Sequence, residues 1–440
     1  MGSCDTLSER TPADVFRSFQ KFAETGAFSS IALLASTGAA LLWANSPWAV
    51  SYHHFWLTEI AVGVASAPLQ LTLEQWINDL LMAAFFLLVG LEIKRELLVG
   101  ELSTVRQAAL PIIAAFGGMV VPAAIYAAVN RGAEGADGWG IPMATDIAFA
   151  LGVLRLVGPR VPLGLKVFLT ALAIADDLGA VVVIALFYTG RIDAGWLLAA
   201  SGCLLLLLAC NRLRLLTLSP YLLVGAALWY CTFCSGVHAT IAGVLLALTI
   251  PVTTRIDSAA FSARARRLLD DFDRAETGDL RVVTSKGQQE ALHSLDAEAS
   301  QVNAPLLRLE HGLHVPVAFG VLPLFALCNA GTAVSDFGGL EQPVVWGTAL
   351  GLVVGKTTGI AGASWLAVRT NLATLPADVT WRDLGGAAVL AGMGLTMSLF
   401  VAGLAFADAR LLNSAKVGIV VASTVAGVAG YLVLRRRERP

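Results

Sequence analysis

Residues 172–180 read Leu-Ala-Ile-Ala-Asp-Asp-Leu-Gly-Ala, which places two adjacent carboxylates, Asp176 and Asp177, inside an apolar run from Pro162 to Tyr188. About 20 apolar residues suffice to cross a bilayer. Because hydrocarbon cannot solvate an ionised group, carboxylates in the middle of such a run are expected to have a function. The alternative, an Asp pair in a loop or a helix cap, fits less well because apolar residues continue on both sides. The stretch predicts a membrane helix with a functional site at its centre.

The composition of the whole chain also indicates a membrane environment. Of 440 residues, 56% are hydrophobic and only 14% are charged. These proportions are typical of an integral membrane protein. The net charge of -2 says nothing about nucleic acid, but no basic face with interleaved aromatic residues suggests a nucleic-acid partner.

Twelve apolar spans predict an all-α integral membrane fold. Spans 1–8 lie at about 27–45, 74–93, 107–129, 141–155, 163–188, 194–210, 217–233 and 236–250. Spans 9–12 lie at about 313–330, 343–368, 384–406 and 414–434. We therefore divide the chain into a cytoplasmic N-terminus (1–26), spans 1–8 (27–250), a charged cytoplasmic loop (251–310), spans 9–12 (311–434) and a basic cytoplasmic tail (435–440).

The distribution of Lys and Arg predicts the orientation. An even number of spans puts both termini on one side. With that side cytoplasmic, 25 of the 30 Lys and Arg residues lie inside and four lie in outer loops. This bias follows the positive-inside rule and predicts cytoplasmic termini.

Two connections stand out between the spans. The first outer loop, about Ser46 to Gln75, has aromatic residues and no Lys or Arg, so we expect it to lie along the membrane interface or to form a hairpin. In the loop 251–310, apolar residues at helical spacing, including Phe261, Leu268 and Phe272, predict one short amphipathic helix. A solvated linker is the alternative for the remainder.

Spans 4 and 11 both look interrupted. Span 4 contains Pro142, and span 11 contains Gly392 and Gly394 at the matching place. At an offset of 251 residues three identities align, namely Thr145 with Thr396, Phe149 with Phe400 and Gly152 with Gly403. Paired interrupted segments are the sequence sign of inverted repeats in transporters. We expect spans 3–5 and 10–12 to be these repeats.

Interrupted helices leave partial charges at their free ends, and two charged side chains can compensate them. Asp146 can face the half-helix N-termini, either in this structural role or as a direct cation ligand. Lys356, in the middle of span 10, can face the C-termini. Neighbouring residues on a helix point about 100° apart, so Asp176 and Asp177 need separate partners. A natural allocation pairs one of them with Lys356 and leaves the other facing a water-filled path, where Thr145 could add an oxygen ligand for an alkali cation.

The sequence resembles the NhaA family of sodium/proton antiporters. Its signature-like stretches are Ala144–Gly152, Ala171–Gly179, Gly90–Leu97, Ser235–Thr240, Arg308–His311 and Gly355–Lys356. The resemblance implies twelve helices with crossed, interrupted helices 4 and 11, a cytoplasmic funnel, a homodimer in the bacterial inner membrane, and no cofactor. It also implies Na⁺ exchange at Asp176 and Asp177, with Asp177 the more direct ligand, Thr145 and Asp146 beside them and Lys356 opposite. The sequence departs from the family pattern in its longer loop at 251–310 and in Thr357-Thr358, where a proline is expected.

Five charged residues look like the family's cytoplasmic pH-sensing cluster, namely Glu92, Arg95, Glu96, Glu310 and His311. Ordinary charged helix ends are the alternative interpretation. A histidine has an unperturbed pKa of about 6.5, which suits a sensor of cytoplasmic acidification.

The sequence thus predicts a pH-regulated, electrogenic antiporter and not an enzyme. It would export Na⁺, and Li⁺, by alternating access. Two titrating carboxylates would return about two protons per cation, and Lys356 either carries one of these protons or only pairs charge. No ATP-binding signature is present.

Two alternatives to antiport make different demands on the sequence. A sodium-coupled solute symporter would need a larger polar cavity. An intramembrane aspartyl protease using Asp146 and Asp177 would need two carboxylates that share a proton, and its glycine-x-glycine-aspartate signature is absent.

Overall fold

The computed structural model describes residues 12–64, 67–100, 102–254, 258–275, 286–332 and 341–436. Residues 1–11 of the predicted N-terminal segment and 437–440 of the predicted tail lie outside this description. The described chain is almost entirely helical, which confirms the all-α membrane fold.

The first half of the chain supplies helices on both sides of a short hairpin. Its elements are α1 (Pro12–Ala44), α2 (Ala49–Trp56), β1 (Glu59–Val64), β2 (Ala67–Thr72), α3 (Leu73–Gln75), η1 (Trp76–Leu81), α4 (Met82–Leu98), α5 (Val105–Val129), η2 (Ala136–Met143), α6 (Ile147–Val157), η3 (Gly158–Arg160) and α7 (Leu163–Phe187).

In the part of the second half that the structure describes, the regular elements are all helices. Its elements are α8 (Ala194–Arg212), α9 (Ser219–Cys234), α10 (Thr240–Thr249), α11 (Ser258–Arg274), α12 (Lys286–Val302), α13 (Pro305–Pro316), η5 (Val317–Val321), α14 (Leu322–Asn329), α15 (Pro343–Leu350), η7 (Gly351–Gly355), α16 (Lys356–Arg369), α17 (Trp381–Leu390), α18 (Leu395–Ala405) and α19 (Ala409–Arg435).

Eight to ten spans are long and apolar enough to cross a membrane, counting only described residues. Eight are continuous, and two more arise if each bent pair is one span, namely Phe28–Ala44 with Ala49–Trp56 and Trp381–Leu390 with Leu395–Ala405. The predicted spans 7 and 8 correspond to the shorter apolar helices α9 and α10. The count of twelve therefore stays a prediction.

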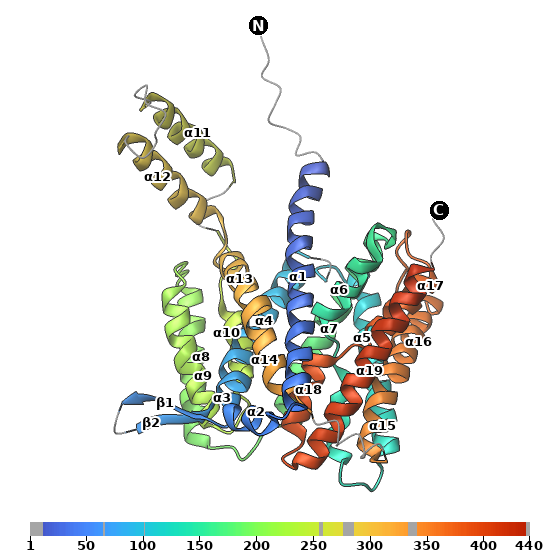
Figure 1. Cartoon of the computed structure of the whole chain (residues 1–440). Coiled ribbons are helices and arrows are strands. Elements are labelled where there is room, and N and C mark those ends of the chain that lie inside the picture. Colours follow the sequence, from blue (N-terminus) through green and yellow to red (C-terminus); the bar gives the residue numbers. More distant parts are fainter. Residues whose placement is uncertain are drawn as a thin grey trace.

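Different elements lie at the two ends of the bundle (Figure 1). The start of α1, the end of α19 and the α11–α12 pair lie at one end, and the β1–β2 hairpin lies at the opposite end. The hairpin is antiparallel, with Glu59 opposite Thr72 and Val64 opposite Ala67. The first outer loop therefore contains both the short helix α2 and a hairpin.

The loop 251–310 contains two helices, so the prediction of a single one is wrong. Phe261, Leu268 and Phe272 of α11 are only half-buried, and α12 packs along α11. An ion pair of 3.2 Å joins Arg264 of α11 to Glu298 of α12. A lone amphipathic helix would leave its apolar face in water, and the second helix covers it.

Close glycine packing brings α5 and α16 together. A Cβ added at Gly359 would lie 2.2 Å from the carbonyl oxygen of Gly117, and one at Gly117 would lie 2.4 Å from the Cβ of Ala363. One turn earlier, Gly355 packs on Pro122. In a bilayer, helices associate through such close backbone approach. This contact sets the depth and rotation of Lys356, the first residue of α16.

We expect Gly359→Ala to destabilise the protein by about 1–3 kcal/mol, because the added methyl group meets backbone across the interface. The matched control is Gly362→Ala in the same helix, where an added Cβ has nothing within 4 Å; its stability should change by about 1 kcal/mol or less. Thermal unfolding in detergent measures both. Equal melting temperatures for the two variants would contradict the packing described here.

Candidate functional site

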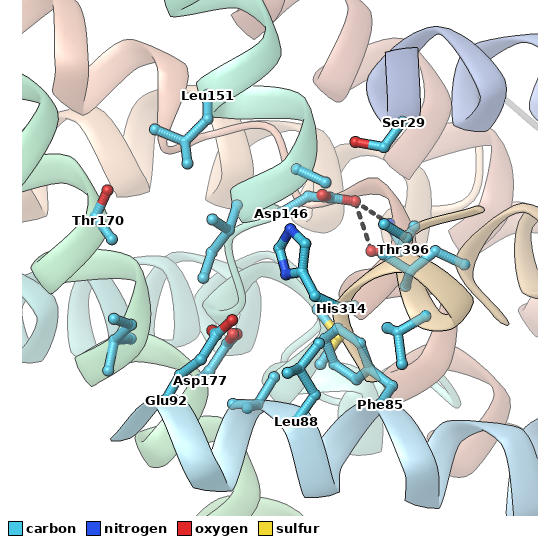
Figure 2. Close-up of a pocket in the computed structure, with 18 of the residues that line it drawn as sticks. Ser29, Phe85, Leu88, Glu92, Asp146, Leu151, Thr170, Asp177, His314 and Thr396 are labelled. Atoms are coloured by element: carbon cyan, nitrogen blue, oxygen red, sulfur yellow. Dashed lines mark hydrogen bonds between the residues drawn. The ribbon is translucent and has the colours of Figure 1, made fainter. Parts of the chain in front are cut away.

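Asp146 joins the two interrupted segments. It is the N-cap of α6, where its Oδ1 accepts a 3.2 Å hydrogen bond from the backbone N–H of Phe149. Its Oδ2 accepts from the backbone N–H of Thr396 at 3.1 Å and from the Thr396 hydroxyl at 2.5 Å. Thr396 lies in the first turn of α18, so one carboxylate serves the N-termini of two half-helices (Figure 2). The expected position of Asp146 at the half-helix N-termini is observed.

The broken segments also satisfy each other's backbone groups. The N–H of Asp146 donates to the carbonyl of Met393 at 2.6 Å, and the Thr145 hydroxyl donates to the carbonyl of Ala391 at 2.9 Å. These carbonyls follow the end of α17, where the helix leaves them without helical partners. The two interruptions, 250 residues apart in sequence, therefore meet directly.

Lys356 pairs with only one of the two aspartates. Its Nζ donates to Oδ2 of Asp176 at 2.5 Å and to the Thr145 hydroxyl at 2.9 Å. The side chains of Lys356 and Asp176 are completely buried. Thr145 in turn donates to Ala391, so Lys356 reaches the C-terminal end of α17 through the threonine. Its direct bonds are to Asp176 and Thr145.

The helix around Lys356 is continuous despite the Thr357-Thr358 departure. The wide turn η7 leads directly into α16, and the hydroxyls of Thr357 and Thr358 bond back to the carbonyls of Val353 and Val354 at 2.6 and 2.7 Å. Widened turns inside helices often occur at functional sites.

Asp177 faces a cavity of about 220 Å³, in contrast to its neighbour Asp176. Its side chain is 1% exposed, and its Oδ1 receives no hydrogen bond from the described residues. Figure 2 shows the carboxylates of Asp177 and Glu92 pointing into the same space. The 100° rotation between successive helix residues separates the two roles: Asp176 meets α16, and Asp177 meets the cavity.

Oxygen atoms dominate the polar wall of this inner cavity. It is lined by the carboxyl groups of Asp146, Asp177 and Glu92 and by the side chains of Thr145 and Thr396. Carboxylate and hydroxyl oxygens are ligands for hard cations. The inner cavity is therefore the place where a small cation can meet Asp177.

Most of the predicted pH cluster gathers at the mouth of the inner cavity. Arg95 lies 3.4 Å from Glu310 and 3.1 Å from Glu96, and Glu92 and Arg95 line the cavity. Glu310 is buried. His311, however, is exposed.

Two basic residues of the inner cavity, Arg155 and His314, were not predicted from the sequence. Helical spacing could have indicated Arg155 from the sequence. It lies on the same face of α6 as Ile147 and Leu151, which also line the cavity. The same helical spacing places His314 one turn after Glu310.

Residues 20–434 match the family model described as Na⁺/H⁺ antiporter 1. Similar proteins named Na⁺/H⁺ antiporter NhaA occur in Oleidesulfovibrio alaskensis, Koribacter versatilis and Wolinella succinogenes, with identities of 48%, 48% and 46%. The chain belongs to the NhaA family. The alignments cover 95%, 98% and 95% of this chain and 93%, 94% and 93% of the three relatives. The predicted family is confirmed over nearly the whole length.

We expect Lys356→Ala to destabilise the protein by about 3–5 kcal/mol, because it leaves the buried Asp176 carboxylate without its counter-charge. Adding Asp176→Asn should recover part of this loss, since the uncompensated charge disappears. The matched control adds Asp177→Asn, which should recover less. Melting temperatures in detergent give the two coupling free energies. Equal recovery by both asparagines would contradict the selective pairing.

Proposed function

We propose that this protein exchanges Na⁺, and Li⁺, for protons across the membrane by alternating access. The observation that supports this best is Asp177, a buried carboxylate with an unbonded oxygen at the inner cavity, next to the Asp176–Lys356 pair. A carboxylate placed in this way can hold either a proton or a cation, but not both. Competition for one site is the basis of obligatory exchange.

The exchange follows from charge balance at the site. A cation entering the inner cavity displaces the proton of Asp177 and draws Asp176 away from Lys356. Because Asp176 is held by the ammonium in this geometry, Lys356 is the favoured carrier of the second proton, and Asp176 is the alternative. About two protons then enter for each cation that leaves, which makes transport electrogenic.

The dimensions of the inner cavity favour a small ion over an organic substrate. Sites for drug-sized organic ligands usually measure about 300–1,000 Å³, whereas this cavity measures about 220 Å³. The intramembrane protease hypothesis is disfavoured by Asp146, whose carboxylate is engaged by three donors from α6 and α18. We therefore favour transport without a cofactor over solute symport or catalysis.

We place the protein in the bacterial inner membrane as a multi-pass homodimer with cytoplasmic termini. The positive-inside bias supports this orientation. The β1–β2 hairpin extends sideways from the bundle (Figure 1) and exposes Ile60 and Val62. Exposed strand edges favour pairing with another chain, which supports a dimer contact there.

Asp177→Asn should abolish sodium-dependent proton flux, because an amide of the same volume cannot exchange a proton for a cation. Asp176→Asn should be nearly as damaging. The assay is a fluorescence measurement of proton flux in everted vesicles to which Na⁺, Li⁺ and K⁺ are added in turn.

The control for this experiment is Asp193→Asn. Asp193 caps α8 through hydrogen bonds to Gly195 and Trp196, and asparagine is an equally good N-cap. This variant should transport at the wild-type rate. Robust sodium-dependent flux in a well-expressed Asp177→Asn variant would refute the assignment.

We assign pH regulation to the charged cluster at the cavity mouth. On acidification, protonation near Glu310 and His311 would alter the ion pairs between α4 and α13 and hold the inner mouth inactive. Glu310→Gln and His311→Ala should therefore shift the acid limb of the activity profile measured at saturating Na⁺. At saturation, competition at the aspartates is suppressed. An unchanged acid limb in both variants would mean that the cluster is structural.

A further inference from the structure

A second cavity, of about 310 Å³, lies toward the hairpin end of the bundle. We call it the outer cavity. Its wall includes Glu74, Asp79, His238, Asn329 and Gly403. None of the aspartates of the candidate site lines it among the described residues. The inner cavity reaches the site, and the outer cavity stops short of it.

Three helical segments line both cavities, each with a different part of its length. Along the span Leu73–Leu98, four residues between Glu74 and Asp79 line the outer cavity, and five between Phe85 and Arg95 line the inner one. Along Pro305–Asn329, Leu322 lines the inner cavity and Asn329 the outer one. Along α18, Thr396 and Met397 line the inner cavity and residues from Leu399 onward line the outer one.

Each of these helices carries a phenylalanine at the boundary. The Phe400 ring of α18 lies 5.6 Å from the ring of Phe86 and 6.2 Å from that of Phe325. Phe86 and Phe325 are completely buried, and Phe400 is 3% exposed. We call these three rings the aromatic layer. Phe85, which lines the inner cavity, packs on Phe86 at 5.3 Å.

Within the aromatic layer, Phe400 is the ring that shares a helix face with Thr396 of the candidate site. It follows Thr396, the partner of Asp146, by one helical turn, so both lie on the same face of α18. On the next turn, an added Cβ at Gly403 would meet nothing within 4 Å. Open space therefore begins directly beyond the Phe400 ring.

On the outer side, Phe400 rests against His238. The two rings meet edge to face at 5.2 Å. The imidazole is held by a 2.8 Å hydrogen bond between its Nδ1 and the Thr240 hydroxyl. Phe400 is thus held by three neighbours from other elements, and its side chain can rotate only if these neighbours yield.

We propose that Phe400 is the outer gate of the transport path: its ring closes the route between the aspartate site and the outer cavity. The proposal rests on the proposed exchange function. Hydrophobic constrictions block ions and water by dewetting. In this conformation the ring keeps a water-filled connection from forming while the inner cavity is open. Exposure of the site to the outside requires the ring to leave its place against Phe86 and Phe325.

The test is proton permeability of proteoliposomes in the absence of Na⁺ and Li⁺. Replacing the ring by a methyl group in Phe400→Ala should raise this sodium-independent leak by roughly tenfold or more, since an apolar constriction is lost. Phe400→Leu, which retains a bulky apolar group, should keep the leak near the wild-type level. Phe400→Val serves in place of the alanine variant if that protein cannot be purified.

A packing control separates a gate from general destabilisation. Phe168 of α7 is 3% exposed and lines neither of these two cavities. Phe168→Ala should lower the melting temperature in detergent without raising the leak. A leak of wild-type size in folded Phe400→Ala, or an equal leak in Phe168→Ala, would overturn the proposal.

The double variant Asp177→Asn with Phe400→Ala distinguishes the gate from the exchange site. It should leak protons although it cannot exchange them for Na⁺. If wild-type protein shows no sodium-dependent flux, the proposed function fails whatever the leak shows. If wild-type protein exchanges normally and Phe400→Ala remains tight, only the gate fails.

Discussion

Two helices of this membrane protein, α6 and α18, begin in its interior, and each start leaves backbone N–H groups without helical partners. In a bilayer such groups cannot turn to water, and each one left unpaired costs several kcal/mol. Asp146 accepts hydrogen bonds from both helix starts. Thr145 and the Asp146 N–H satisfy the carbonyls left by the end of α17. The two breaks must therefore lie at the same place, and the residues of the proposed ion site lie around them.

The same constraint separates the roles of two neighbouring aspartates. Asp176 is buried against Lys356, whose position depends on the close contact between α5 and α16. Removing two charges from water is costly, and the short pair and the Thr145 hydroxyl offset this cost. Asp177 has no such partner and faces the inner cavity. A fixed ion pair beside an unpaired carboxylate gives a site that can change its charge without unfolding.

The helical span Pro305–Asn329 connects the regions on either side of this site. It carries Glu310 in the charged cluster, His314 in the wall of the inner cavity and Phe325 in the aromatic layer. This span also follows directly after α12 of the loop 251–310. A tilt of this one span would move the inner mouth and the proposed outer gate together. Alternating access needs such an element, because the two sides must never be open at once.

The sequence alone determined the membrane class, the family and the interrupted segments, since apolar length, buried carboxylates and helix breakers are local properties of the chain. It also indicated Asp176, Asp177, Asp146 and Lys356, because an ionised residue in an apolar span has few explanations. It could not decide which aspartate Lys356 binds, that His311 is exposed, or that loop 251–310 holds two helices. Nor could it find the aromatic layer, since a buried phenylalanine is unremarkable in a membrane helix. These features depend on rotations and contacts between helices distant in sequence, and only tertiary packing fixes them.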